Sequence, residues 1–146
     1  MLEKLQKILH AAGIEAHETA RSAGLYYDGT QHGELFPCIL VCNDYHVTGI
    51  SGADLDNMIA GYLRRARLSD VYTIERCGHQ YYNIRRVMLR SDLDSARRLD
   101  RISTAFLDAF WQCLHDDPTA RDNDSERARI AGQLAISALT SEEVPA

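Results

Sequence analysis

The sequence has little lysine and no long apolar run. Of its 16 lysine and arginine residues, only Lys4 and Lys7 are lysines, so arginine supplies nearly all of the positive charge. No stretch approaches the ~18 apolar residues that a membrane span needs. The N-terminal segment carries charges inside its apolar pattern and lacks the uninterrupted core and small-residue cleavage site of a signal peptide. We therefore expect a cytoplasmic protein with no membrane association.

Recognised catalytic signatures are also missing. There is no Gly-rich phosphate loop, no Gly-x-Ser-x-Gly turn and no His-Glu-x-x-His helix. Chance Cys–His neighbours exist at Cys77 with His79 and at Cys113 with His115, but no motif surrounds them that would lower a thiol pKa or orient a base. We expect that the protein is not an enzyme.

A metal site is not expected either, although Cys38, Cys42 and His46 follow one another at intervals of four. This run is typical of a strand, in which four residues span about 13 Å. Zinc–thiolate bonds are only about 2.3 Å long, so the two thiols do not reach one ion. None of the four cysteines forms a Cys-x-x-Cys pair, which favours reduced thiols. No metal or cofactor is expected.

What the sequence does have is the composition of a globular domain. It has 146 residues, 45% apolar and 25% charged, which is enough for one buried core. The net charge of −5 argues against a general nucleic-acid binder. That total conceals an asymmetry, since residues 61–101 contain ten arginines and five acids.

The apolar periodicity predicts an α+β fold, with an antiparallel sheet flanked by helices. Helical spacing runs from Leu2 to Ala12, from about Ser51 to Arg67 and from about Ser91 to His115. Short runs rich in β-formers at 14–19, 25–28, 36–42 and 45–50 predict three or four strands, and runs at 71–77 and 81–89 predict two more. The expected order is α-β-β-β-α-β-β-α, followed by a C-terminal helix at 125–139. We expect residues 1–117 to form the domain and residues 118–146 to form a polar linker with a helical extension.

Two apolar faces are candidate surfaces for a partner or for a second copy of the chain. The last long helix is apolar over a wider face than one sheet usually covers, and its candidates are Phe106, Phe110, Trp111 and Leu114. The helix before it offers Leu55, Ile59 and Tyr62 as a second choice. The alternative is that all seven side chains belong to the core.

The arginines of residues 64–101 are candidates for a basic band. Ordinary solvated faces with local ion pairs are the first interpretation, an acidic peptide or protein partner the second, and nucleic acid the third. The band consists of Arg64, Arg65, Arg85, Arg86, Arg90, Arg97, Arg98 and Arg101.

Three stretches resemble YbjN-like bacterial proteins, which share a fold with the class I chaperones of type III secretion. They are Leu55-Asp-Asn-Met-Ile-Ala-Gly-Tyr-Leu-Arg-Arg-Ala, Val71-Tyr-Thr-Ile-Glu-Arg-Cys-Gly-His-Gln-Tyr-Tyr, and Val87-Met-Leu-Arg-Ser-Asp-Leu-Asp-Ser-Ala-Arg leading into 102–114. The resemblance covers about residues 1–117. The arginine-rich centre and the tail 118–146 depart from the family pattern.

The resemblance implies a small acidic protein that forms a homodimer and holds an extended segment of a partner protein, without catalysis. It favours the YbjN-like branch over a dedicated secretion chaperone, because nothing in the sequence identifies a secretion client. An immunity or inhibitor protein also fits the size and acidity. A nucleic-acid-associated regulator that uses the arginine band remains the alternative function.

Overall fold

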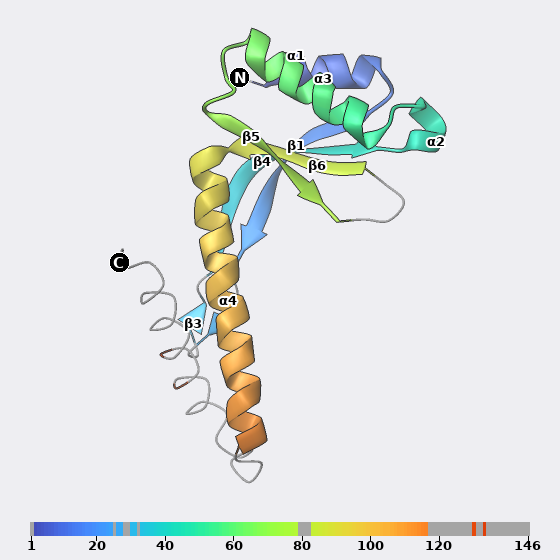
Figure 1. The fold of residues 1–146 in the computed structure, drawn as a ribbon. Coiled ribbons are helices and arrows are strands. Elements are labelled where there is room, and N and C mark those ends of the chain that lie inside the picture. The colour runs from blue at the N-terminus through green and yellow to red at the C-terminus, as the bar shows by residue number, and fades with distance from the viewer. Residues whose placement is uncertain are drawn as a thin grey trace. The chain divides into compact units, whose positions relative to one another are not determined.

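The computed structural model describes residues 2–24, 26–27, 30–31, 33–78, 83–116, 130 and 133 (Figure 1). The fold is α+β, as predicted, with a four-stranded antiparallel sheet and a long last helix. The chain divides into two compact units. One comprises Met1–Arg21 and Phe36–Asp94, and the other comprises Ser22–Leu35 and the chain from Ser95 onward.

The first unit contains the sheet and three helices. Its strands lie in the order β1-β4-β6-β5, so that β1 and β5 are the two edges. Residues Val87 of β6, Ile39 of β4 and Ile74 of β5 lie in register across three strands. The elements are α1 (Glu3–Ala11), β1 (Glu15–Ala23), β4 (Glu34–Asn43), α2 (Tyr45–Thr48), α3 (Gly52–Arg65), β5 (Tyr72–Cys77), β6 (Asn83–Leu89) and the first turn of α4 (Arg90–Asp116).

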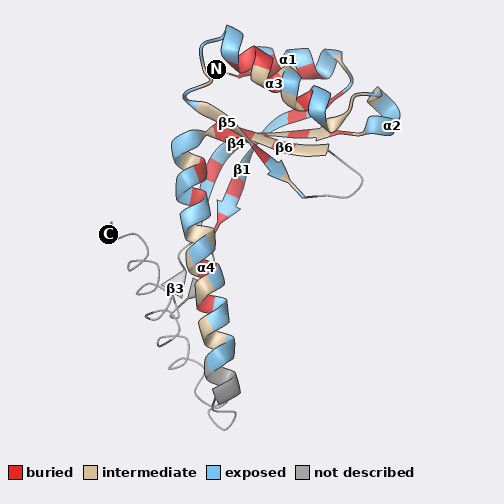
Figure 2. Cartoon of the chain, in the orientation of Figure 1, coloured by how far each residue is buried: buried red, intermediate tan, exposed pale blue. Residues whose placement is uncertain are grey.

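Helices α1 and α3 cover one face of the sheet, and the buried side chains of the helices and strands meet between them (Figure 2). The apolar positions of both helices recur every three or four residues, which places them on one side. Alternate residues of the strands complete this core. Its fully buried members include Leu5, Leu9, Ile14, Val41, Leu55, Ile59 and Val87.

The helix ends agree with the capping signals in the sequence. The Ser51 side chain accepts a hydrogen bond from the Asp54 backbone N–H and so caps α3. Gly13 follows the end of α1 with φ +82°, a left-handed conformation that glycine adopts without a steric penalty.

The predicted strand at 45–50 is wrong, because Tyr45–Thr48 forms the short helix α2. The Asp44 side chain accepts a hydrogen bond from the His46 N–H, and Gly49 ends the turn with φ +70°. These local caps outweigh the β-propensity of the run. The main sheet is therefore built in the order α-β-β-α-β-β-α, with one strand fewer before α3 than predicted.

The second unit contains most of α4 and a two-stranded hairpin. In the hairpin, β2 (Tyr26–Tyr27) pairs with β3 (Thr30–Gln31). On α4, Phe106 is buried against Ile102, Ala105, Ala109 and Phe110. The predicted domain at 1–117 with a helical extension at 118–146 stays a prediction.

Two further expectations concern the rest of the chain. The predicted helix at 125–139 lies outside the described residues, apart from Ile130 and Gln133, which are helical. Among the described helices, none combines the length and the apolar character needed to cross a membrane.

Candidate functional site

The edge strand β5 turns every second residue's backbone N–H and C=O away from β6. The Arg90 N–H donates to the Val71 carbonyl over 2.8 Å, which fixes 71 and 90 as a hydrogen-bonded pair. In an antiparallel ladder such pairs alternate with pairs whose backbone groups point outward. From the register Tyr72↔Leu89 and Ile74↔Val87, the outward groups belong to Tyr72, Ile74 and Arg76.

One of those outward groups already has a partner within the chain. The Tyr72 N–H donates to the Leu68 carbonyl over 2.9 Å. The N–H and C=O groups of Ile74 and Arg76 and the C=O of Tyr72 face away from β6. A strand edge of this kind is a template for an extended peptide.

A groove of about 520 Å³ lies beside this edge, between β5 and the outer side of α3. Helix α3 contributes Arg64 to its wall, and the start of α4 contributes Arg90. Among the described residues, no aspartate or glutamate lines it. The full lining is Asn57, Ala60, Leu63, Arg64, Ser69, Tyr72, Thr73, Ile74 and Arg90.

The two arginines of the groove are held by different means. Arg64 lies exposed in the last turn of α3, where its charge complements the helix dipole. Arg90 donates from Nε and Nη2 to the Ser69 carbonyl over 2.9 and 2.7 Å. Because an uncharged carbonyl accepts both bonds, Arg90 keeps its net positive charge beside the groove.

The other predicted basic residues of the sheet are not part of the groove. Arg85 is buried and donates from Nε to Oδ1 of Asp56 on α3 over 2.7 Å. Arg86, the next residue, points to the opposite face and donates to Glu75 over 3.0 Å. The alternation of a strand separates these neighbours, and each pairs with a carboxylate that a second arginine shares, Arg76 at Asp56 and Arg21 at Glu75.

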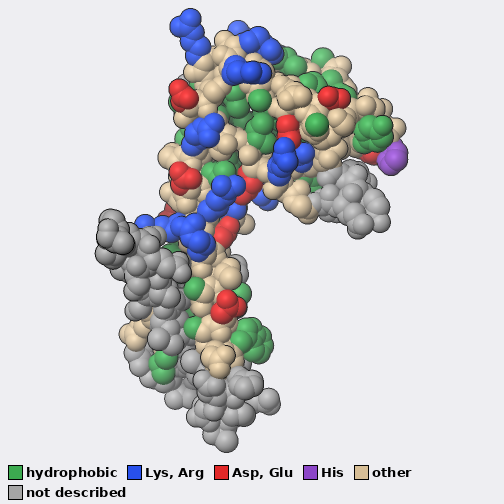
Figure 3. Space-filling view, in the orientation of Figure 1, with side chains coloured by type: hydrophobic (Ala, Val, Ile, Leu, Met, Phe, Trp, Pro, Cys, Tyr) green, Lys and Arg blue, Asp and Glu red, His purple; other side chains and the backbone are tan. Residues whose placement is uncertain are grey.

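The remaining band residues lie on α3 and on α4. Arg65 is exposed at the end of α3 but does not line the groove. Arg97, Arg98 and Arg101 are exposed on the part of α4 that belongs to the second unit. On the face of the first unit drawn in Figure 3, basic side chains alternate with acidic ones. Of the predicted band, only Arg64 and Arg90 line a common groove.

The predicted apolar surface on α3 lies in the core. Leu55 and Ile59 have no exposed area and Tyr62 is only 8% exposed, all three in the cluster beneath α1 and α3. Their side chains therefore stabilise the first unit and are not presented to a partner.

The apolar surface on α4 is divided between buried and exposed positions. Phe106 is buried and its ring centroid lies 5.8 Å from that of Phe110. Trp111 is 65% exposed and packs edge-on against Phe110. Leu107, which the candidate set omitted, is 43% exposed one turn before Trp111. The Leu114 side chain lies outside the described part of the chain.

The thiols of Cys38, Cys42 and Cys77 lie in surroundings that disfavour the thiolate. Cys38 and Cys42 lie on the same face of β4, and burial raises the pKa of the thiols of Cys38, Cys42 and Cys77. Higher thiol pKa values mean less thiolate and lower reactivity. Within the described residues, no three metal-ligating side chains gather at one point.

Sequence reasoning missed the parts of the groove that are contributed by backbone. Strand 71–77 was predicted, but its position at the edge was not, because strand order depends on contacts between distant segments. Ser69 was missed as well, since it acts through its carbonyl, which every residue possesses.

Comparison of the chain with protein-family models, with curated proteins and with solved structures gave no match.

Proposed function

We propose that this protein is a non-enzymatic protein-binding module, chaperone-like or adaptor, that holds an extended acidic segment of a partner protein along β5. The observation that carries this proposal is the outward-facing backbone of Ile74 and Arg76 beside a groove in which Arg64 and Arg90 are the only charged side chains among the described residues. It agrees with the resemblance to YbjN-like and secretion-chaperone-like proteins, and with a cytoplasmic location.

The backbone and the side chains of this site contribute differently to binding. Backbone hydrogen bonds to β5 fix an extended conformation, and each contributes only about 0.5–1.5 kcal/mol net. They do not distinguish side chains. The two arginines supply the preference for acidic residues, and the apolar side chain of Ile74 favours an occasional aliphatic neighbour.

A matched pair of variants at Arg76 tests the backbone contribution. The Arg76 N–H points outward, so Arg76→Pro removes this donor without removing a β5–β6 hydrogen bond. Arg76→Ala removes the same side chain but keeps the donor. The probe is a fluorescein-labelled peptide of alternating Glu and Val, followed by fluorescence anisotropy.

We expect Arg76→Pro to weaken binding about tenfold relative to Arg76→Ala, as the loss of a donor to a peptide carbonyl implies. Equal affinities for the two variants, at equal thermal stability, would rule out β5 as the docking edge.

A second matched pair tests the charges. Arg64→Ala should weaken binding of the acidic peptide, whereas Arg65→Ala, one residue along the same exposed turn but outside the groove, should not. A peptide in which Lys replaces Glu should not bind. If Arg65→Ala and Arg64→Ala have the same effect, the attraction is general and the groove is not the site.

The homodimer is part of this proposal and is tested separately. Leu107 and Trp111 are the large exposed apolar side chains of α4 that a second copy would cover. Light scattering over a concentration series should report a dimer, and Trp111→Glu should shift it toward monomer. A monomer at tens of micromolar would rule out the homodimer but would not contradict the proposed peptide site.

The alternative function is association with nucleic acid through the exposed arginines of α4. Arg97, Arg98 and Arg101 lie within two helical turns. An oligonucleotide titration at several salt concentrations decides this, because phosphate contacts give a steep decrease of affinity with salt. Absence of binding at low salt would end this alternative.

A further inference from the structure

The outward-facing backbone of β5 ends at Tyr72, where a turn of the chain lies at the edge. The Leu68 carbonyl accepts hydrogen bonds from the Val71 N–H over 3.1 Å and from the Tyr72 N–H over 2.9 Å. Because the Tyr72 N–H points away from β6, Leu68 lies on the outer side of β5 at this residue. A partner strand can therefore pair with Ile74 and Arg76, but its pairing stops at Tyr72.

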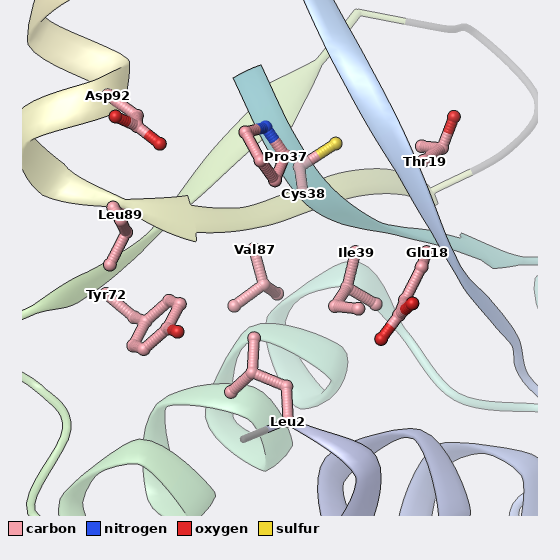
Figure 4. A pocket seen from close by; sticks show the side chains of 10 residues that line it. All are labelled: Leu2, Glu18, Thr19, Pro37, Cys38, Ile39, Tyr72, Val87, Leu89 and Asp92. Atoms are coloured by element: carbon pink, nitrogen blue, oxygen red, sulfur yellow. The ribbon is translucent and has the colours of Figure 1, made fainter.

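The side chains of Tyr72, Ile74 and Arg76 lie on the helix-bearing face of the sheet. Figure 4 shows the Tyr72 ring on the same side of the sheet as Val87, and both Tyr72 and Ile74 pack against the core beneath α1 and α3. Arg76 pairs with Asp56 of α3 over 2.7 Å. Residues directly opposite each other in a ladder share a face, so a segment paired with β5 points every second side chain toward the groove.

Both arginines of the groove lie at the Tyr72 end of β5. Arg90 directly follows Leu89, the residue of β6 that is paired with Tyr72, and its guanidinium donates to the Ser69 carbonyl of the turn. Arg64 lies in the last turn of α3, and residues 66–71 lead from that helix to Tyr72. Positive charge in the groove is therefore concentrated where the pairing of a bound strand must stop.

This polarity sets the direction of a bound segment. An antiparallel segment brings its C-terminal end to Tyr72, whereas a parallel segment brings its N-terminal end there. An ammonium group beside two guanidinium groups is repelled, and a carboxylate is attracted. Asp70, the acid of the turn, is exposed and does not line the groove. The site thus favours an antiparallel segment that ends in a carboxylate.

We propose that the β5 groove receives the free C-terminal end of a partner protein, antiparallel to β5, with the terminal carboxylate beside Arg64 and Arg90. The preceding residues pair with Ile74 and Arg76. The inference rests on the proposed peptide site and adds to it the chain end and the direction. Capture of a terminal carboxylate at the end of a paired strand is a known mode of peptide recognition.

Three versions of one peptide test the chain end by fluorescence anisotropy. The alternating Glu–Val peptide carries fluorescein at its N-terminus and is made as the free acid, as the C-terminal amide and as a free acid extended by Gly-Ser-Gly-Ser. We expect the amide and the extended peptide each to bind about tenfold more weakly than the free acid, because one charge-assisted contact is lost. The extended peptide has the same net charge as the free acid, so general attraction to the arginines would not weaken it.

Variants of the arginines locate the carboxylate. Arg90→Gln and Arg64→Gln should each reduce the preference for the free acid over the amide. Arg65→Gln is the matched control, because Arg65 is exposed on the same helix end but does not line the groove, and it should retain the wild-type preference. Thermal unfolding checks that each variant folds. A preference for the free acid that neither groove variant reduces would place the carboxylate elsewhere and overturn the proposal.

The outcomes separate this inference from the proposed function. If the three peptides bind equally while Arg76→Pro still binds more weakly than Arg76→Ala, the C-terminal inference is wrong and the peptide site stands. If no peptide binds, both are wrong.

The direction of the segment has its own readout in nuclear magnetic resonance. A nitroxide at the N-terminus of the peptide should broaden the amide signals of Arg76 and Cys77 more than that of Ser69. The reverse pattern would show a parallel segment and would overturn the proposal.

Discussion

Arg21 and Glu75 lie on the two opposite edge strands of the sheet, yet their side chains form a bidentate ion pair. Nε of Arg21 is 2.7 Å from Oε1 of Glu75, and Nη2 is 2.9 Å from Oε2. Three strand spacings, about 14 Å, separate the edges of a four-stranded sheet. The pair therefore spans the whole width of the face opposite α1 and α3, and Arg86 donates to the same Oε1 over 3.0 Å.

Removing the carboxylate of this pair should destabilise the protein strongly. Glu75→Ala leaves the buried guanidinium of Arg21 without its partner, and such losses cost about 3–5 kcal/mol. Urea unfolding of Glu75→Ala and of the exposed-strand control Glu15→Ala measures this. A loss below 1 kcal/mol for Glu75→Ala would mean that the cluster is solvated.

Glu75 should also make stability depend on pH. Burial by itself raises the pKa of Glu75, but hydrogen bonds from Arg21 and Arg86 outweigh it and lower this pKa below 4.5. A lowered carboxyl pKa stabilises the fold above the unfolded value, and the contribution is lost as pH falls through the folded value. Between about pH 5 and pH 3, wild type should lose more unfolding free energy than Glu75→Gln. Parallel curves for the two proteins would contradict this.

Two glycines of α3 should respond oppositely to alanine. A methyl group at Gly61 meets the guanidinium of Arg65, with Nη1 at 3.2 Å and Cζ at 3.9 Å, on an exposed side chain that can move. Helix propensity then predicts a gain of about 1 kcal/mol for Gly61→Ala. A methyl group at Gly52 would lie 2.9 Å from Oδ1 of Asn83 and 3.0 Å from Nη2 of Arg85. The Arg85 side chain cannot move away easily, because it donates a hydrogen bond to Asp56. Thermal melts should show Gly52→Ala less stable than wild type by about 1 kcal/mol.

Asn43 should be essential for the segment around α2. It is fully buried, donates from Nδ2 to the Ile50 carbonyl over 2.7 Å and accepts from the Thr48 hydroxyl over 2.6 Å. Asn43→Ala leaves both partners unsatisfied and should cost about 2–3 kcal/mol in chemical denaturation. Val47→Ala, at a position of α2 that is 76% exposed, should change stability by less than about 0.5 kcal/mol.

The thiols should alkylate slowly in the folded protein. Burial raises the pKa of Cys38, Cys42 and Cys77, and Cys38 is only 6% exposed. With iodoacetamide near neutral pH, peptide mass spectrometry should find Cys38 modified last and all three modified rapidly in urea. Rapid modification of Cys38 without urea would show that its strand opens.

Local signals in the sequence were sufficient for most of the elements. Periodicity and turn chemistry act between residues that are close in the chain. They predict the apolar faces of α1, α3 and α4, the Ser51 cap and the hairpin β5–β6. The strand predicted at 45–50 is wrong, although local signals decide this segment too. The caps at Asp44 and Gly49 favour a short helix more strongly than the β-propensity of the residues favours a strand.

The functional surfaces depended on information that no local pattern contains. The apolar stripe of Leu55 and Ile59 is equally compatible with a dimer face and with a core, and only the packing of α1 over α3 makes it core. The arginine count predicted a band, but strand alternation places Arg85 and Arg86 on opposite faces beside different carboxylates.

The sequence by itself determined the α+β class, the acidic total and the arginine-rich centre, because these depend on composition and short-range periodicity. Only the tertiary structure decided that β5 is an edge and that Arg64 and Arg90 line one groove. Each of these relations joins residues far apart in the chain. Their proximity results from strand order and helix packing, which the burial of the whole apolar core selects.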